Sequence, residues 1–221
     1  MTELKNFEEQ RWVRLDQPIV FRHRAALDLI KPGSSVLDVG CGDGLFLKLV
    51  NQQKKTTGVG VDLSENAIKK ALEDNNQSIK FHVFDLDSGK LPFEDNAFDE
   101  VVALDVLEHS LEPTEFLKEM SRVSKCRLII GVPNFSSFPA RLQCLFGQVP
   151  ENNKPKKGHV YWFNYVVLKK ILEDNSLEIV ELKYNTQGGN IPGIKQLFML
   201  LGKILPNLYA LSFVVLCRKV N

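Results

Sequence analysis

Along the chain, short apolar runs alternate with longer segments in which apolar residues recur every three or four positions. Such runs are typical of buried strands. They cover residues 36–39, 57–62, 79–84, 100–104 and 127–132. The segments between them fit amphipathic helices, each with one face turned to a core. Strands that alternate with helices form parallel βαβ units, so the pattern predicts an α/β fold with a doubly wound sheet and helices on both faces.

Two further segments extend this pattern toward the ends of the chain. Residues 19–30 fit one more helix, which ends in a Lys-Pro-Gly sequence. The mostly apolar stretch 194–217 is interrupted by Lys203 and Pro206 before it reaches the length of a membrane span. We therefore expect a helix followed by a buried strand in this stretch, and no membrane span.

The first apolar run leads into a glycine-rich loop, residues 40–44, and then into a helix. This layout brings backbone N–H groups and a helix N-terminus against a ligand. A dinucleotide fingerprint would have its third glycine at position 45, where this chain has Leu45. Asp38, just before the loop, would repel a pyrophosphate and suits a cation such as the sulfonium or ammonium group of S-adenosylmethionine. A tight turn without a ligand is the alternative for the loop alone.

The second run ends in Asp62, 22 positions beyond Gly40. A carboxylate at about this spacing can accept hydrogen bonds from both hydroxyls of a ribose. Its alternative role is to cap the next helix, but Ser64 fits the cap position and Glu65 fits the first turn. The spacing therefore favours Asp62 as a ribose ligand with a free carboxylate.

The third and fourth runs are followed by further candidate residues. Asp85 can accept a hydrogen bond from an adenine amine while Leu86 covers the ring, although Asp85 also suits a turn. Leu104 and His109 come at and after the end of the fourth run. Because ligands of doubly wound sheets bind at the carboxyl ends of the strands, we expect these residues to share one site with Asp62.

Composition excludes several classes of protein. The 221 residues suit one α/β domain, and the net charge of +1, from 28 basic and 27 acidic residues, does not indicate a nucleic-acid partner. Four cysteines without C-x-x-C spacing favour reduced thiols in a cytosolic protein. The polar, acidic N-terminus is unlike a signal peptide.

Together these segments resemble the class I S-adenosylmethionine-dependent methyltransferases. The matching pieces are residues 36–44, 61–64, 85–86 and 91–109, and the resemblance spans roughly residues 33–184. It implies a Rossmann-like, mostly parallel sheet of seven strands, the last of which, at 211–218, runs antiparallel.

The resemblance also implies S-adenosylmethionine as cofactor, with S-adenosylhomocysteine as product. The cofactor-binding residues that it implies are Asp38, Gly40, Cys41, Gly42, Gly44, Asp62, Leu63, Asp85, Leu86 and Leu104. Asp38 and the loop glycines would hold the methionine part, Asp62 the ribose, and Asp85 with Leu86 the adenine.

His109 is the candidate catalytic base, should the acceptor need deprotonation, and a structural histidine is the alternative. Asp105, Glu108 and His109 offer ligands for a divalent cation, as in the ubiquinone-type O-methylating branch of the family. Short motifs of this kind are weak and Glu-His is widespread at this place without metal, so we expect no metal there.

Residues 132–150, with His159 and a helix from Asn164, are similar to the methionine-biosynthesis MetW-type proteins, although residues 151–158 depart from them. Two functions follow from these resemblances. The first is methyl transfer to a small or medium-sized acceptor. The alternative is a MetW-like, non-catalytic accessory that binds and activates a homoserine acyltransferase. Leu45 and Asp38 count against a third possibility, an NAD-binding protein.

We expect a single methyltransferase domain over residues 1–221. Its parts are a helical cover (1–32), a cofactor-binding half (33–133), a lid insertion (134–162) and a C-terminal half (163–221). The cover can fold over the cofactor mouth, which makes Trp12 and His23 substrate-side candidates, although a solvated basic surface is the alternative for the helix. The polar segment 151–158 lies between apolar flanks, and we expect it to act as a mobile flap.

Overall fold

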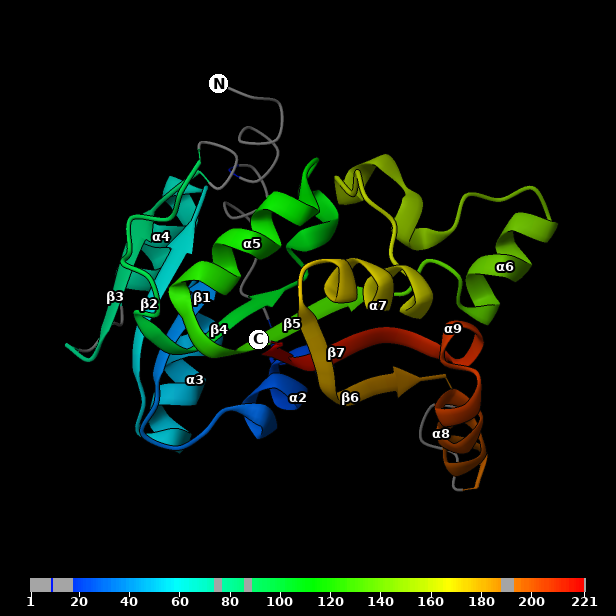
Figure 1. The fold of residues 1–221 in the computed structure, drawn as a ribbon. Coiled ribbons are helices and arrows are strands. Elements are labelled where there is room, and N and C mark those ends of the chain that lie inside the picture. Colours follow the sequence, from blue (N-terminus) through cyan, green and yellow to red (C-terminus); the bar gives the residue numbers. More distant parts are fainter. Residues whose placement is uncertain (1–8, 10–17, 74–76, 86–88, 188–192, 221) are drawn as a thin grey trace.

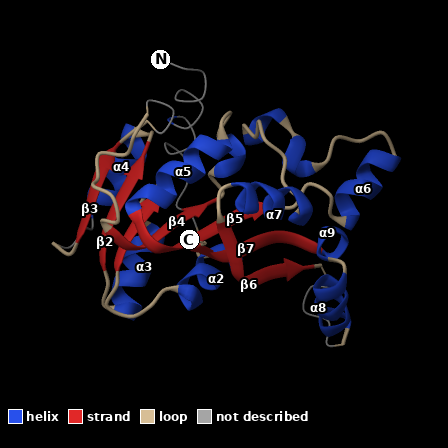
Figure 2. Ribbon diagram, viewed as in Figure 1, coloured by secondary structure: helices blue, strands red, loops and turns tan. Residues whose placement is uncertain are grey.

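The computed structural model describes residue 9 and residues 18–73, 77–85, 89–187 and 193–220. In this part of the chain one seven-stranded sheet runs through the molecule, with helices on both of its faces (Figure 1). Figure 2 shows the strands as one continuous layer. Two of the predicted site residues, Trp12 and Leu86, lie outside the described residues.

The sheet has the predicted doubly wound topology. Its strands are β1 (Ser35–Val39), β2 (Thr57–Asp62), β3 (Ile79–Val83), β4 (Phe98–Leu104), β5 (Ser124–Pro133), β6 (Leu177–Thr186) and β7 (Ala210–Lys219). They lie in the order β3-β2-β1-β4-β5-β7-β6, with β1 to β5 parallel. β7 runs antiparallel to both β5 and β6, so the α/β class and the antiparallel last strand are confirmed.

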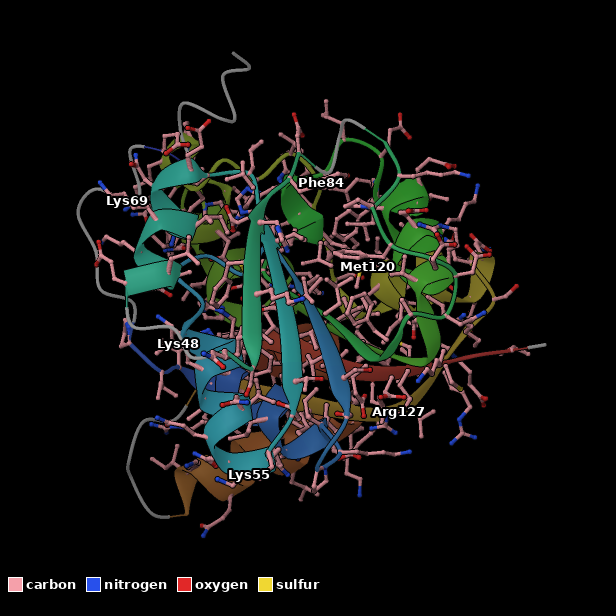
Figure 3. The ribbon with its side chains drawn as sticks, turned by 90° about the vertical axis from the view of Figure 1, so that its left-hand side faces the viewer. Lys48, Lys55, Lys69, Phe84, Met120 and Arg127 are labelled. Carbon is pink, nitrogen blue, oxygen red and sulfur yellow. The ribbon has the colours of Figure 1, made fainter. Side chains whose placement is uncertain are left out.

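Helices cover the two faces of the sheet. Those that pack on it are α2 (Phe21–Leu29), α3 (Leu45–Lys54), α4 (Glu65–Glu73), α5 (Pro113–Val123) and α7 (Tyr165–Asp174). The first three pack on one face, and α5 and α7 on the other. Figure 3 looks onto the β3 edge, with Lys48 of α3 and Lys69 of α4 on one side of the strands and Met120 of α5 on the other.

Side chains of the central strands alternate between two cores. On β5, Ile129 packs with α2 and α3, whereas Leu128 and Ile130 pack with α5 and α7. On β7, Val214 and Val215 divide in the same way. Because both faces of these strands are buried, their sequences are continuous apolar runs and not alternating ones.

A buried ion pair fixes the amino ends of the central strands. Arg127 Nε lies 2.9 Å from a carboxylate oxygen of Glu100, and its Nη2 donates to Leu29 O at 2.7 Å. Burial raises the pKa of Glu100, and the hydrogen bond from Arg127 opposes that shift. The pair therefore joins β4 and β5 to the end of α2, at the edge of the sheet away from the glycine loop.

The C-terminal apolar stretch forms a helix and then a strand, as predicted. It contains α8 (Ile194–Ile204), a short α9 (Pro206–Tyr209) and then β7. Tyr184 of β6 donates its hydroxyl to Met199 O of α8 at 2.7 Å. None of the described helices is long and apolar enough to cross a membrane.

The expected lid insertion is an ordered excursion between β5 and α7. It contains α6 (Phe138–Leu145) and two 3-10 turns, η3 (Glu151–Asn153) and η4 (Pro155–Lys157). Glu151 forms ion pairs with Lys154 at 2.6 Å and with Lys156 at 2.9 Å. Exposed pairs of this kind stabilise a segment only weakly, so movement of residues 151–158 stays a prediction.

Candidate functional site

The glycine loop lies where the sheet changes direction, because the neighbours β1 and β4 belong to the two halves of the winding. Gly40 N and Cys41 N both donate to Val61 O of β2, at 2.8 and 3.0 Å. Gly40 has a φ of +75°, and a Cβ there would lie 2.4 Å from Val106 Cγ2. Only glycine satisfies both constraints, so this position lets the loop touch the segment after β4.

Asp62, at the end of β2, connects the loop to α4. Its Oδ2 accepts from Gly42 N at 2.8 Å and its Oδ1 accepts from Ser64 N at 2.9 Å. Ser64 Oγ in turn accepts from Ala67 N at 3.1 Å, which confirms Ser64 as the N-cap of α4. The expectation that Asp62 would therefore be free is wrong, because both of its oxygens accept backbone N–H groups. Ribose hydroxyls would share those oxygens through their remaining lone pairs.

Asp38 gives the site its electrostatic character. It is only 3% exposed, and burial, followed by the charge of Asp62, raises its pKa well above the ordinary value. Burial also raises the pKa of the Cys41 thiol, with Asp62 and Asp38 adding to the shift. Two buried carboxylates repel each other, so this end of the sheet favours a cation and disfavours a pyrophosphate.

The remaining cofactor candidates lie at the ends of neighbouring strands. Phe84 N donates to Asp62 O at 2.8 Å, which places half-buried Asp85 beside the end of β2. Leu63 and Leu104 are half-buried at the ends of β2 and β4. The parallel strands thus end at one edge of the sheet with these residues, as predicted, and their contact with a cofactor stays a prediction.

The 3-10 turn η2 (Leu107–His109) follows β4 along the chain and is hydrogen-bonded to the end of the insertion. Glu108 O accepts from Val160 N at 2.8 Å and from Tyr161 N at 3.0 Å. His109 Nδ1 lies 3.0 Å from Gly158 O. His109 is therefore held against the insertion through its Nδ1.

The fold does not group Asp105, Glu108 and His109 in the way that the motif suggested. Asp105, with a φ of +58°, pairs with Arg22 of α2 at 3.1 Å. His159 lies beside the other two residues instead, with its Nε2 3.8 Å from Glu108 Oε1 and its ring centroid 4.9 Å from that of His109. From the sequence, His159 is part only of the resemblance to MetW-type proteins and has no predicted role in the site, since a single histidine in an irregular segment carries no spacing signal.

The N-terminal part places His23 in the interior and adds one contact. His23 is only 8% exposed and lies beside Phe46 of α3, with ring centroids 6.1 Å apart, so its substrate-side role stays a prediction. Burial, with Arg22 adding, lowers the pKa of His23 to about 4. The carboxylate of Glu9 accepts from Glu65 N at 2.7 Å and Asn66 N at 3.1 Å, where an acid suits the α4 N-terminus. No pattern in the sequence signals the Glu9 contact.

Several known proteins are similar to this chain in sequence. A family model described as "Methionine biosynthesis protein MetW" matches residues 21–180. The bifunctional methionine biosynthesis protein MetXA/MetW of Rhodopirellula baltica is 32% identical over 142 residues, which are 60% of this chain and 22% of that protein. The phosphatidylethanolamine N-methyltransferase of Cereibacter sphaeroides is 29% identical over 170 residues, 76% of this chain and 82% of the enzyme. For several curated relatives that it matches, the chain spans only 22% to 33% of their length.

Solved structures share the fold. Magnesium protoporphyrin IX methyltransferase of Synechocystis, solved with bound S-adenosylhomocysteine, superposes with a TM-score of 0.64 at 20% identity, covering 97% of this chain and 94% of that one. The family model covers well over half of the chain, including the glycine loop, Asp62, η2 and the insertion. The chain therefore belongs to the MetW family of methionine biosynthesis proteins, built on the methyltransferase fold.

Proposed function

We propose that this protein binds S-adenosylmethionine at the carboxyl edge of the sheet and transfers its methyl group to a small or medium-sized acceptor. The observation that carries the proposal is the pair of buried carboxylates, Asp38 and Asp62, at the glycine loop. A cation beside them relieves their repulsion. S-adenosylmethionine supplies a sulfonium and an ammonium group and has no phosphate that the pair would repel.

The chemistry asks little of the protein beyond placement. The acceptor attacks the methyl carbon while the bond between carbon and sulfur breaks, and neutral S-adenosylhomocysteine leaves. Alignment of the two reactants and exclusion of water supply much of the rate. We assign any proton transfer from the acceptor to the Glu108–His109 turn. Gly158 O can only accept, so it holds the proton on His109 Nδ1 and leaves the lone pair on Nε2.

Calorimetry tests cofactor choice. S-adenosylmethionine and S-adenosylhomocysteine should bind, and NAD should not. Gly40→Ala should abolish binding, because its Cβ would strike Val106. Gly147→Ala is the matched control, because Gly147 also has a positive φ, +68°, but nothing lies within 4 Å of its Cβ position. Tight NAD binding, or equal cofactor affinity of the Gly40→Ala variant and its control, would contradict the proposal.

A second function has support of its own: a non-catalytic accessory that binds and activates a homoserine acyltransferase. The family model and the bifunctional MetXA/MetW relative favour it. Helix α8 provides an exposed apolar surface, with Leu197 53%, Leu200 59% and Ile204 67% exposed. Apolar surface of this kind marks sites of protein–protein contact.

Co-expression with a homoserine acyltransferase separates the two functions. An accessory should co-purify with that enzyme and raise its activity, and Leu200→Glu on α8 should weaken both effects. Val180→Glu is the control, because Val180 is also exposed but lies on β6. Methyl transfer to a small molecule without any partner, lost in Gly40→Ala, would instead favour the catalytic function.

We infer a cytosolic location from the cysteines. Cys41, Cys126, Cys144 and Cys217 are all free thiols in the structure, as a reducing compartment would leave them. Fractionation of the source cells tests this inference directly.

A further inference from the structure

Three chemically matched side chains meet where η2 contacts the end of the insertion. Glu108, His109 and His159 each present one ligand atom, and these atoms all lie within 4.8 Å of one another. Glu108 is fully buried, and the side chain of His159 is only 10% exposed. Among the histidines of the described residues, His82 on β3 is exposed, whereas this pair is gathered around a buried carboxylate.

Backbone carbonyls fix the tautomers of the two histidines. His109 Nδ1 lies 3.0 Å from Gly158 O, and His159 Nδ1 lies 2.9 Å from Asn152 O. A carbonyl oxygen only accepts hydrogen bonds, so each Nδ1 carries a proton and donates it. In the neutral imidazoles each Nε2 therefore holds a lone pair. For His159 that lone pair faces Glu108 Oε1 at 3.8 Å.

Two imidazole nitrogens and a carboxylate oxygen that lie within 4.8 Å of one another form a set of ligand atoms suited to a cation. We propose that Glu108, His109 and His159 form a binding site for a divalent transition-metal ion of the Zn²⁺ class. Imidazole nitrogen and carboxylate oxygen are common ligands of such ions, and Mg²⁺ and Ca²⁺ prefer all-oxygen sites. A histidine that ligates metal with one nitrogen usually donates from the other to a carbonyl or carboxylate, and both histidines here do so.

The spacing needs only a small adjustment to accept the ion. Ligand atoms in a tetrahedral zinc site are about 3.4 Å apart, given bonds of roughly 2.1 Å. The 3.8 Å between His159 Nε2 and Glu108 Oε1 is close to that value, and the widest separation is within 4.8 Å. The backbone is already held in place, because Glu108 O accepts from Val160 N and Tyr161 N. We therefore expect side-chain rotation, without movement of the backbone, to close the site.

Metal binding here goes beyond the proposed methyl transfer and does not depend on it. A protein ligand set of three leaves a position open for an outside ligand. If the protein is a methyltransferase, that position suits an acceptor oxygen whose pKa the ion would lower. The site would then bind the acceptor through the ion, and His109 would act as a ligand and not as a base.

Titration of the chelator-treated, full-length protein with Zn²⁺ and with Co²⁺ tests the proposal. We expect one ion per chain and, for Co²⁺, the visible absorption of a four- or five-coordinate complex. His159→Gln should weaken Zn²⁺ binding at least about 100-fold, since even changes outside the ligand set cost 10- to 100-fold. His82→Gln, at an exposed histidine, should bind Zn²⁺ as the unchanged protein does.

Two results would overturn the proposal: no stoichiometric binding, or equal Zn²⁺ affinity in His159→Gln and His82→Gln. Circular dichroism of each variant shows that it is folded. The titration uses neither cofactor nor acceptor, so its failure would leave methyl transfer standing. A protein that holds Zn²⁺ but never binds S-adenosylmethionine would fail only the proposed function.

Discussion

Replacement of Asp62 by asparagine tests the centre of the site, because it keeps the shape of the side chain and removes its charge. In the structure the two carboxylate oxygens accept separately, one from Gly42 N at 2.8 Å and the other from Ser64 N at 2.9 Å. Asparagine has one oxygen and one NH₂ group, so in either orientation one backbone N–H meets another donor. The variant must lose one of these bonds.

The expected cost follows from those two contacts. A hydrogen bond to a charged group contributes about 1.5–3 kcal/mol, and the buried donor left over adds to the loss. One effect opposes it, since removal of the Asp62 charge also removes the repulsion that, after burial, raises the pKa of Asp38. We therefore expect Asp62→Asn to lower the free energy of unfolding by about 1.5–2 kcal/mol at neutral pH. Affinity for S-adenosylhomocysteine should fall by about 10- to 150-fold, the equivalent of one such bond to the ribose.

Urea unfolding and calorimetry measure the two quantities independently. Asp43→Asn is the matched control in the same loop. Asp43 accepts one backbone hydrogen bond, from Leu45 N at 3.2 Å, and an amide oxygen can replace that acceptor. The control should change both quantities by less than about 0.5 kcal/mol. If Asp62→Asn is as stable as the control and binds the ligand within twofold of the unchanged protein, the assignment of Asp62 is wrong.

Three further predictions follow from buried charge and from the insertion. A cationic ligand stabilises the ionised form of Asp38, whose pKa is raised in the empty site. Affinity for S-adenosylmethionine should therefore fall as the pH is lowered through that pKa. Calorimetry should show a smaller pH dependence for the Asp38→Asn variant. Folding lowers the pKa of His23 from 6.5 to about 4. As the pH is lowered, the unfolded chain therefore takes up a proton on His23 at a higher pH than the folded protein does. Acidification from pH 6.5 to 4 should therefore lower the free energy of unfolding by up to about 3 kcal/mol. Urea unfolding of the His23→Gln variant should not show this loss. Trypsin should cut the insertion first after Lys156 or Lys157, and saturating S-adenosylhomocysteine should slow that cut severalfold. An unchanged rate would show that residues 151–158 do not close over the site.

Sequence patterns were sufficient for the elements that are mostly buried. The strands β1, β2, β4 and β5 are buried over most of their length on both faces, so each contains a short, mainly apolar run that local reasoning finds. Their order follows from the winding of βαβ units. β6 has no such signal, because it is an edge strand and most of its side chains are exposed or half-buried. Its pairing with β7 is a consequence of the tertiary fold.

For the candidate site as well, the sequence predicted some features and missed others. Asp38 and Asp62 were predicted from strand ends and loop spacing, since parallel strands must end at one edge. The hydrogen bonds that the Asp62 carboxylate accepts from backbone N–H groups were not predicted, because they depend on the conformation of the loop around Gly42. The group at Glu108 and His109 needed His159, which an insertion with its own helix and turns carries back to the end of β4. No periodic pattern encodes such a return.

The glycine loop and the end of the insertion are connected by packing and hydrogen bonds through the segment after β4. Val106 packs against Gly40 of the glycine loop, and η2 begins at the next residue. Glu108 O then holds Val160 and Tyr161, and His109 contacts Gly158. We therefore expect a ligand that shifts the loop to shift this turn as well, and with it the end of the insertion, because interiors packed at van der Waals contact transmit displacement. Either proposed function has a use for this link. A methyltransferase would align its acceptor when the cofactor is bound, and an accessory would report cofactor occupancy to its partner.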